Sequence, residues 1–483
     1  MTFEPVIGLE IHAQLLTETK IFCGCSTAFG APPNSHVCPV CLGLPGALPV
    51  LNRRAVEHAA RTALALGCTV QETSVFARKN YFYPDLPKGY QISQYERPLA
   101  TDGCVEYTLG GESRQARILR VHMEEDAGKS IHEGFPDSSH ATYLDFNRSG
   151  VPLIEIVTCP DLRTPAEAAR FFQCLRGILL ALGVNDGNME EGSLRCDANV
   201  SVRRRGATTL GVKVEVKNLN SFRYLERALA FEIERQIGVL REGGAVVQET
   251  RLWDVARGRT APMRSKEEAH DYRYFPDPDL PPLVVEPEWV AEARASLPEL
   301  PEARKRRFVD KYGLPERDAA PLAEDQALAA FYEATAGAAG NPKAAANWIM
   351  GELTRRLKQL GVGIGQAGVT PEALGSLIRL VDAGTIGGSV AKNVFDRMYG
   401  SGRSAEAIVA EEGLSRIGDS DALAGIVRRT LADNRAAADK YRSGKTGALG
   451  YLVGQVMRAT RGQADPRVVG ALLRAELDDS PAE

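Results

Sequence analysis

Apolar and polar residues alternate near the start of the chain, over residues 6–15. A period of two over this length predicts a half-buried β-strand whose two faces differ in chemistry. Glu10 and His12 stand on the polar face, about 7 Å apart along the strand, so both can reach one small ion or one phosphate. The alternative is a surface strand on which these two residues share no partner. The apolar face carries Leu9, Ile11, Ala13 and Leu15, and the polar face carries Glu10, His12 and Gln14.

The same alternation returns at residues 193–203 and 212–217, and helical spacing of apolar residues occurs between the predicted strands. Helices are predicted at residues 53–66, from a capping box at Thr164 to Gly183, and after Asn220 or Ser221. Each strand presents acids, amides and bases from one face only. We therefore expect an α+β fold, with an antiparallel sheet that helices cover on one face and that is open and charged on the other.

Residues 118–125 predict another strand, which ends in three consecutive acids. Glu125 continues the core face of this strand, and Glu124 and Asp126 stand on either side of it. Like charges this close raise one another's pKa or require a cation. The other residues predicted on the core face are Leu119, Val121 and Met123.

Residues 153–157 are apolar on both faces except for Glu155, which predicts a central strand with one buried acid. An unpaired buried carboxylate costs several kcal/mol. A metal ion, Arg148 or a bound phosphate–metal complex would compensate for this charge. The alternative to a functional acid is a structural pair between Glu155 and Arg148.

Four of the nine cysteines cluster as Cys23-Gly24-Cys25 and Cys38-Pro39-Val40-Cys41, with twelve residues between the pairs. This spacing is typical of a four-cysteine zinc site, although C-x-C is less usual than C-x-x-C. The alternative is four reduced thiols in a packed loop. A redox role is disfavoured because neither pair opens a thioredoxin-like βαβ unit. The remaining cysteines are predicted to lie in the core: Cys68, Cys104, Cys159, Cys174 and Cys196.

The chain is long enough for two to four domains. It has no signal-peptide pattern and no apolar run of the ~18–20 residues that span a membrane, so a cytoplasmic protein is expected. Residues 275–283 carry four prolines, which predicts an irregular segment at the end of the first domain. The sequence after Pro287 is rich in alanine and predicts helices, one of them at residues 344–360.

Basic residues gather near the C-terminus, in a chain whose net charge is -4. Residues 426–474 contain ten lysines and arginines against three acids, a local excess of seven positive charges. This excess favours a phosphate-backbone partner, and a solvated helix face is the alternative. The basic residues are Arg428, Arg429, Arg435, Lys440, Arg442, Lys445, Arg458, Arg461, Arg467 and Arg474.

Together these motifs resemble the GatB family, the B subunits of bacterial tRNA-dependent amidotransferases, nearly from end to end. The resemblance rests on VIGLEIHAQL (6–15), RKNYFYPDLPKGYQIS (78–93), HMEEDAGKS (122–130), LDFNRSGVPLIEIV (144–157), EEGSLRCDANVSVR (190–203), VEVKNLNSFRY (214–224), SKEEAHDYRYFPDPDLPPL (265–283) and GQVMRATRGQADP (454–466).

The resemblance implies a glutamine synthetase-like cradle domain at residues 1–292, a helical domain at 293–405 and a YqeY-like tail at 406–483. It implies a cytoplasmic heterotrimer with an amidase, the A subunit, which releases ammonia from glutamine, and with a small C subunit. The B subunit would use ATP and Mg²⁺ to phosphorylate the side-chain carboxylate of Glu-tRNA(Gln), Asp-tRNA(Asn) or both. Ammonia would then form the amide. The mischarging aminoacyl-tRNA synthetase is a further candidate partner, and a non-catalytic tRNA-docking scaffold is the alternative function.

The resemblance also assigns roles to residues. Glu10, His12, Glu125 and Glu155 are the implied Mg²⁺ ligands, and His12 is the least usual of these because Mg²⁺ prefers oxygen. Lys79 and Glu124 are further catalytic candidates, and Arg195, Glu215 and Lys217 are candidates for phosphate contacts or the ammonia path. The implied structural zinc ligands are Cys23, Cys25, Cys38 and Cys41, and the implied tRNA contacts are Lys445, Arg458 and Arg461.

Overall fold

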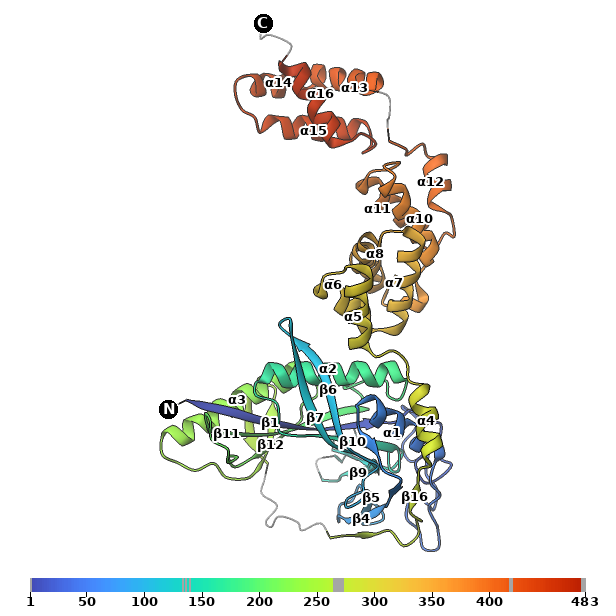
Figure 1. Ribbon diagram of the computed structural model, residues 1–483, viewed down its shortest axis with the longest axis vertical. Coiled ribbons are helices and arrows are strands. Elements are labelled where there is room, and N and C mark those ends of the chain that lie inside the picture. Colours follow the sequence, from blue (N-terminus) through green and yellow to red (C-terminus); the bar gives the residue numbers. More distant parts are fainter. Residues whose placement is uncertain are drawn as a thin grey trace. The chain divides into compact units, whose positions relative to one another are not determined.

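The computed structural model describes residues 2–132, 134, 137–138, 140–263, 273–416 and 420–478. It divides into two compact units, Met1–Arg304 and Lys305–Glu483 (Figure 1). Unit 1 combines sheets with helices, and the described regular elements of unit 2 are helices, which agrees with the predicted α+β class.

A nine-stranded sheet organises unit 1, and its neighbouring strands are antiparallel except for one parallel pair, β12 with β13. The sheet is therefore antiparallel, as predicted, except at that pair. The predicted strand around Glu155 is β10, and it lies in the interior of the sheet as expected. The strands in spatial order are β14 (Arg259–Pro262), β13 (Thr250–Asp254), β12 (Val214–Lys217), β11 (Leu194–Arg204), β1 (Phe3–Gln14), β10 (Pro152–Thr158), β7 (Glu112–Glu125), β6 (Ala100–Leu109) and β2 (Thr69–Val70).

Three helices share the core with one face of this sheet: α1 (Arg53–Ala65), α2 (Pro165–Leu182) and α3 (Phe222–Arg241). Figure 1 shows α2 and α3 along the same face. The predicted capping box is present at Thr164, and Ser221 caps α3 through the N–H of Tyr224. Leu9, Ile11 and Ala13 are fully buried in this core, so the polar residues of β1 lie on the other face, as predicted.

The prediction of the core face of β7 is wrong for one residue. Leu119 is 50 % exposed, whereas Val121 and Met123 are fully buried. The register between β10 and β7 shifts here, because Val157 pairs with Arg120 and Thr158 pairs with Ile118. Leu119 is therefore the extra residue of a β-bulge, which reverses the alternation of side chains before Val121.

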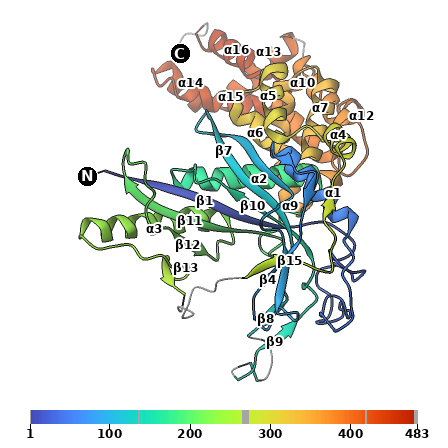
Figure 2. The same ribbon diagram turned by 60° about the horizontal axis from the view of Figure 1, so that its bottom comes forward.

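The proline-rich segment is also more regular than predicted. Tyr274–Pro276 forms β15, an edge strand of a small sheet with β4 (Ala77–Asn80) and β5 (Tyr90–Ser93), and Leu283–Val284 forms β16, which pairs with β3 (Thr73–Ser74). An edge position tolerates Pro276, since proline lacks one ladder hydrogen bond. Figure 2 shows β4 and β15 at the end of the large sheet away from α3. Residues 265–272 of the motif at 265–283 lie outside the described residues.

Two short elements complete unit 1: the hairpin of β8 (Lys129–Ile131) and β9 (Tyr143–Asp145), and helix α4 (Pro287–Ala295). Trp289 and Val290 of α4 pack against the core of the large sheet. The hydrophobic core of unit 1 thus continues beyond the proline-rich segment.

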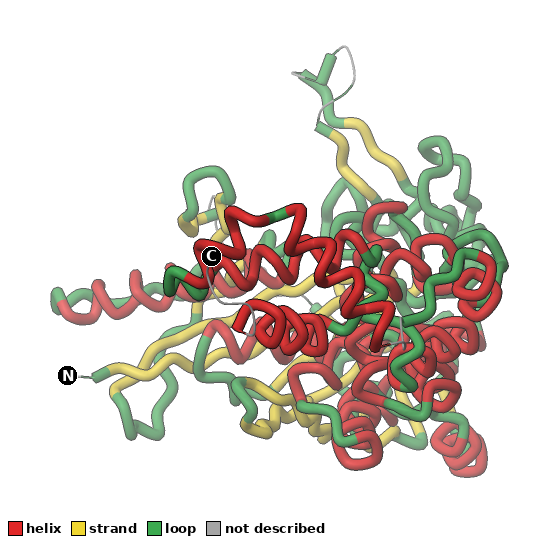
Figure 3. Tube along the Cα trace, turned by 90° about the horizontal axis from the view of Figure 1, so that it is seen from above, coloured by secondary structure: helices red, strands yellow, loops and turns green. Residues whose placement is uncertain are grey.

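The described helices of unit 2 bury two separate hydrophobic clusters, and Figure 3 shows these helices in red. The predicted helix at 344–360 is present, with a π-helical turn at Ile349–Leu353. Among the described residues, every helix is too short or too polar to span a bilayer. The first cluster includes residues from α5 (Pro301–Tyr312), α6 (Glu316–Glu324), α7 (Gln326–Ala339), α8 (Pro342–Trp348), α9 (Thr354–Leu360), α10 (Pro371–Asp382), α11 (Gly388–Met398) and α12 (Ala405–Glu411), and the second joins α13 (Ser420–Asp433), α14 (Arg435–Arg442), α15 (Ala448–Ala459) and α16 (Pro466–Asp478).

Candidate active site and four-cysteine centre

The register of three adjacent strands brings a row of ionisable side chains together on the open face of the large sheet. His12 of β1 pairs with Glu155 of β10, and Glu155 pairs with His122 of β7. Directly opposed residues on neighbouring strands hold their Cβ atoms about 4.5–5.5 Å apart. Glu124 lies two residues beyond His122 and so on the same face. We call these four residues the His/Glu cluster.

Within the His/Glu cluster, each imidazole lies between the same two carboxylates. The Nε2 atom of His12 is 3.4 Å from Glu155 and 3.8 Å from Glu124. The Nε2 atom of His122 is 3.5 Å from Glu155 and 3.8 Å from Glu124. These distances exceed those of ordinary hydrogen bonds. They suit atoms that share a cation, because ligands with metal bonds of about 2.1 Å in an octahedron lie about 3–4 Å apart.

Three residues of the cluster, His12, Glu124 and Glu155, each offer one possible metal-ligand atom, and these atoms all lie within 4.8 Å of one another. The donor set of two carboxylates and one imidazole can hold a divalent cation. It thus fits a metal site, while Mg²⁺ would complete its coordination with water or phosphate oxygens.

The charges in the His/Glu cluster perturb one another. Burial acts to lower the pKa of His12, but its contact with Glu155 and the charge of Glu124 raise the pKa to about 9. Burial acts to raise the pKa of Glu155, but His12 and His122 hold it well below its usual range. Burial and the charge of Glu155 raise the pKa of Glu124. Two acids with opposite shifts in one buried place are typical of a functional site.

Glu10 and Glu125, two of the expected Mg²⁺ ligands, have other partners. The carboxylate of Glu10 accepts a hydrogen bond of 2.9 Å from Asn199, and burial together with Glu155 and Glu215 raises its pKa. Glu125 pairs with Lys88 and accepts a hydrogen bond of 2.8 Å from the N–H of Ile92. Glu125 lines a cavity of about 240 Å³ beside Cys41, so the structure does not bring it into the His/Glu cluster.

Arg148 does not pair with Glu155, so the predicted alternative of a Glu155–Arg148 pair is wrong. Arg148 donates hydrogen bonds to the carbonyls of Ala127 and Gly128 and lies 3.7 Å from Asp126. The charge of Glu155 is instead matched by two histidines, one of which belongs to a distant part of the sequence.

Asp126 binds a different arginine at the edge of the His/Glu cluster. Arg195 donates hydrogen bonds of 3.1 and 3.2 Å to its two oxygens, and Gln14 donates one of 2.7 Å. Burial acts to raise the pKa of Asp126, but Arg195 and Arg148 hold it below its usual range. Arg195 stands opposite His12 in the register of β1 and β11, so this pair adjoins the cluster.

Two further groups of predicted residues line the same face. Lys217 is 2.7 Å from Asp197 and 2.8 Å from Glu215, and both acids raise its pKa although burial acts to lower it. Lys79 of β4 pairs with Tyr274 of β15, and its charge acts on Glu124. Lys79 therefore reaches the His/Glu cluster from the small sheet.

Sequence reasoning missed His122 and Tyr274 as site residues, and it named Asp126 only as one of three consecutive acids. The period of two in β7 was a usable signal for His122, because it places His122 and Glu124 on one face and Glu125 on the other. Tyr274 follows residues that carry no such periodic pattern. The charges of Glu155 and Glu124 add to the effect of burial in raising its pKa.

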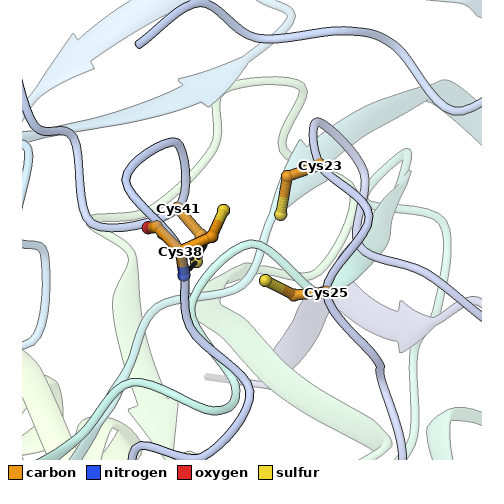
Figure 4. Close-up of side chains that lie close together, drawn as sticks. All are labelled: Cys23, Cys25, Cys38 and Cys41. Atoms are coloured by element: carbon orange, nitrogen blue, oxygen red, sulfur yellow. Dashed lines mark hydrogen bonds between the residues drawn. The ribbon is translucent and has the colours of Figure 1, made fainter.

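The four clustered cysteines converge from two loops after β1. Figure 4 shows Cys23 and Cys25 on one side, facing Cys38 and Cys41 on the other. All four sulfur atoms lie within 4.8 Å of one another, and the sulfurs of Cys38 and Cys41 are 3.9 Å apart. A tetrahedral zinc site with Zn–S bonds of about 2.3 Å needs sulfurs about 3.8 Å apart. The four thiols therefore fit this metal.

The remaining cysteines do not all lie in the core. Cys68 and Cys196 are buried as predicted, but Cys104 is exposed. Cys104 stands next to the buried Val105 on β6, so its side chain points to the outer face of that strand.

The predicted tRNA contacts lie on the surface of the last four helices. Lys445 precedes α15, Arg458 is in its last turn, and Arg461 follows it with a left-handed φ of 51°. All three residues are exposed.

Comparisons with known proteins agree over the whole chain. The family profile described as GatB/GatE catalytic domain matches residues 5–291, and one described as GatB domain matches residues 330–477. Proteins named as the B subunit of aspartyl/glutamyl-tRNA(Asn/Gln) amidotransferase are similar to it. That of Anaeromyxobacter dehalogenans (strain 2CP-1) is 56 % identical and that of Carboxydothermus hydrogenoformans 54 % identical, covering 99 % and 98 % of this chain and 99 % of each relative. The chain therefore belongs to the GatB family.

Proposed function

We propose that this chain is the B subunit of an amidotransferase that converts Glu-tRNA(Gln), Asp-tRNA(Asn) or both into the amides, with ATP as the activating substrate. Family membership supports the reaction class. The observation that carries the catalytic role is the convergence of His12, Glu124 and Glu155 from three strands at one point of the open face. A docking surface for tRNA alone does not need such a buried pair of acids.

In the proposed first step, an oxygen of the substrate's side-chain carboxylate attacks the γ-phosphorus of ATP. The bond from that phosphorus to its bridging oxygen breaks and ADP leaves. In the second step ammonia adds to the acyl carbon and loses a proton. The bond between that carbon and the phosphate oxygen then breaks, and phosphate leaves. The carboxylate is a poor electrophile, and the phosphate supplies the leaving group.

His12, Glu124 and Glu155 would hold Mg²⁺, with His122 beside them and Glu10 approaching from the same face. Bound Mg²⁺ neutralises charge on the transferring phosphoryl group. Lys79, Arg195 and Lys217 would bind phosphate oxygens, because they are cations on this face that lie near the His/Glu cluster. Glu215 would lie on the path of the incoming ammonia. Glu125 would act from the side of the cysteine loop.

The proposed assembly is a cytoplasmic heterotrimer with an amidase (the A subunit) and a small C subunit. The four cysteines would bind a structural zinc ion, as the fit of their sulfur atoms supports. Lys445, Arg458 and Arg461 would contact the tRNA backbone through the tail. The proposed division is a cradle at 1–292, a helical domain at 293–405 and a tail at 406–483.

The test measures ADP formation and amidation by the assembled heterotrimer, with ammonium replacing glutamine. We expect ADP to form only with mischarged tRNA, ATP and Mg²⁺, and to equal the amide formed. The same assay with Glu-tRNA(Gln) and with Asp-tRNA(Asn) identifies the substrate. Amidation without ADP formation, or ADP formation that persists after the B subunit is left out, would support the docking-scaffold alternative instead.

A further inference from the structure

Lys20 is a buried lysine beside the four cysteines. Its side chain is completely buried. The ammonium nitrogen is 2.7 Å from the carbonyl oxygen of His36, 3.2 Å from that of Phe146 and 3.6 Å from the sulfur of Cys41. A lysine ammonium has three hydrogens to donate, so each has an acceptor.

The acceptors of Lys20 suit a metal-loaded centre. A zinc ion with four thiolates carries two net negative charges, and a buried ammonium is stable only next to compensating charge. The sulfur of Cys41 also accepts the backbone N–H of Cys38 at 3.2 Å. Outer hydrogen-bond donors of this kind tune a metal centre.

The acceptor carbonyl of Phe146 belongs to another segment, residues 144–150, which precedes β10. This segment is joined to the cysteine loop at several more points. The N–H of His36 donates to the side chain of Asn147 at 2.8 Å, and that side chain donates to the carbonyl of Pro32 at 2.7 Å. Asn34 accepts from the N–H of Phe146 at 2.8 Å.

Segment 144–150 leads on to the His/Glu cluster. Arg148 lies 3.7 Å from Asp126, and the N–H of Gly150 donates to the carbonyl of Asp126 at 2.9 Å. The side chain of Asp126 in turn binds Arg195, the residue opposite His12. A continuous series of contacts thus runs from Cys41 through Lys20 and segment 144–150 to the edge of the cluster.

Gly150 of this segment lies close to Lys20 and Cys41. Gly150 has a left-handed φ of 83°, and a Cβ atom there would lie 3.5 Å from Cδ of Lys20 and 3.6 Å from Cβ of Cys41. The N–H of Ile21, next to Lys20, donates to the carbonyl of Gly150 at 2.9 Å. The segment is therefore hydrogen-bonded to the residue next to Lys20, and it lies close to the side chains of Lys20 and Cys41.

We propose that Lys20 is a positioning residue that ties a metal-loaded four-cysteine centre to segment 144–150, so that the bound metal orders this segment beside the His/Glu cluster. The inference deepens the proposed function and rests on the proposed metal at the four cysteines. It gives the cysteine centre a role in placing Arg148 and Asp126, beyond folding its own loop.

The first test compares the variants Lys20→Met and Asn147→Ala in the full chain. Lys20→Met removes the donor to Cys41, and we expect zinc affinity in a chelator competition to fall 10–100-fold. In cobalt-substituted protein its thiolate-to-cobalt absorption band should move to longer wavelength, since a thiolate without this donor is more readily oxidised. Asn147→Ala loosens segment 144–150 without touching a sulfur, so its cobalt band should stay in place. Lys358→Met, at an exposed lysine of α9, controls for the loss of a charge.

The second test needs no substitution. Hydrogen exchange of the wild-type chain is compared before and after a chelator removes the zinc. Backbone amides of residues 144–150 should exchange at least ~10-fold faster without metal, while those of α3 keep their rates.

Unchanged zinc affinity and an unmoved cobalt band in Lys20→Met would overturn the role of Lys20, and unchanged exchange at residues 144–150 would overturn the coupling. If Lys20→Met does not fold, the exchange comparison still decides. A full chain that holds no zinc would overturn the metal centre and this inference with it. None of these readouts depends on amidation, so failure here is distinguishable from failure of the amidotransferase proposal.

Discussion

The His/Glu cluster of unit 1 and the basic helices at the end of unit 2 hold charge in contrasting ways. In the cluster, the side chain of Glu124 is 4 % exposed, and four ionisable groups from three strands contact one another. On the terminal helices, the side chain of Arg428 is 64 % exposed, and its ion pair is a single one with Glu476. The side chain of Arg428 therefore has mainly water around it.

This difference predicts how each region responds to substitution. In a buried cluster, the removal of one charge changes the state of the others, so single changes have large and specific effects. Exposed cations that meet a phosphate backbone act through their summed charge, so single changes have small and additive effects. The four-cysteine centre should respond to substitution as the buried cluster does, because a tetrahedral zinc site needs all four of its ligands.

The largest effect is expected at the four-cysteine centre. Cys38→Ser removes one of four thiols from the proposed zinc site, and structural zinc typically supplies about 10–16 kcal/mol of apparent binding energy. We expect the purified variant to have lost its stoichiometric zinc by elemental analysis, and proteases to cut residues 26–47 readily. Cys104→Ser, at an exposed thiol, is the control and should keep its zinc. If Cys38→Ser kept its full zinc content, not every cysteine would be needed as a ligand. The four-cysteine centre would then not respond to substitution as the His/Glu cluster does.

The second largest effect is expected at Glu155. Glu155→Gln keeps the shape of the side chain but removes the charge between His12 and His122. Loss of one electrostatic catalytic contact typically costs about 3 kcal/mol, so ammonium-dependent amidation should fall by roughly a hundredfold or more. Binding of tRNA should be unchanged. The matched control is Glu106→Gln on the exposed face of β6. Near-normal amidation in Glu155→Gln would mean that the cluster is structural.

Smaller, additive effects are expected on the terminal helices. Alanine at Lys445, Arg458 and Arg461 should weaken tRNA binding for every tRNA tested. The slope of log affinity against log salt should become shallower by about 1 for each phosphate that is no longer neutralised. Glutamine hydrolysis by the proposed amidase partner should not change. If one of the three single variants carried the whole loss, the terminal helices would resemble the cluster rather than contrast with it.

The smallest effect is expected at a partly exposed ion pair of unit 2. Arg307 pairs with Glu333, which also accepts a hydrogen bond of 3.0 Å from Tyr312, and these donors hold the pKa of Glu333 below its usual range. The pair therefore stabilises the fold above the unfolded pKa of about 4.3, and this contribution is lost as the pH falls through the lower folded value.

Arg307→Met should lower the free energy of unfolding by no more than about 1 kcal/mol at neutral pH, because the pair is partly exposed. Denaturant titrations of variant and wild type should converge as the pH falls below about 4. A difference that persisted in acid would point to lost packing instead.

The local pattern of the sequence was sufficient to predict many of the strand faces and helix ends of unit 1. The alternation in β1 and β11, the caps of α2 and α3, and the composition of the four-cysteine loops are properties of neighbouring residues. Backbone geometry converts such properties directly into faces, helix ends and turns. The sequence by itself therefore determined which side chains share a strand face and which residues begin a helix.

Only the tertiary structure decided how these local pieces meet. The register of β1, β10 and β7 matched Glu155 with two histidines instead of Arg148, and brought in Glu124 while Glu125 faced the cysteine loop. A bulge between β10 and β7 turned Leu119 outward. Lys20 carries no mark of burial in its local sequence, because lysine is normally exposed. Strand pairing and buried charge depend on contacts between residues far apart in the chain, which a local pattern does not encode.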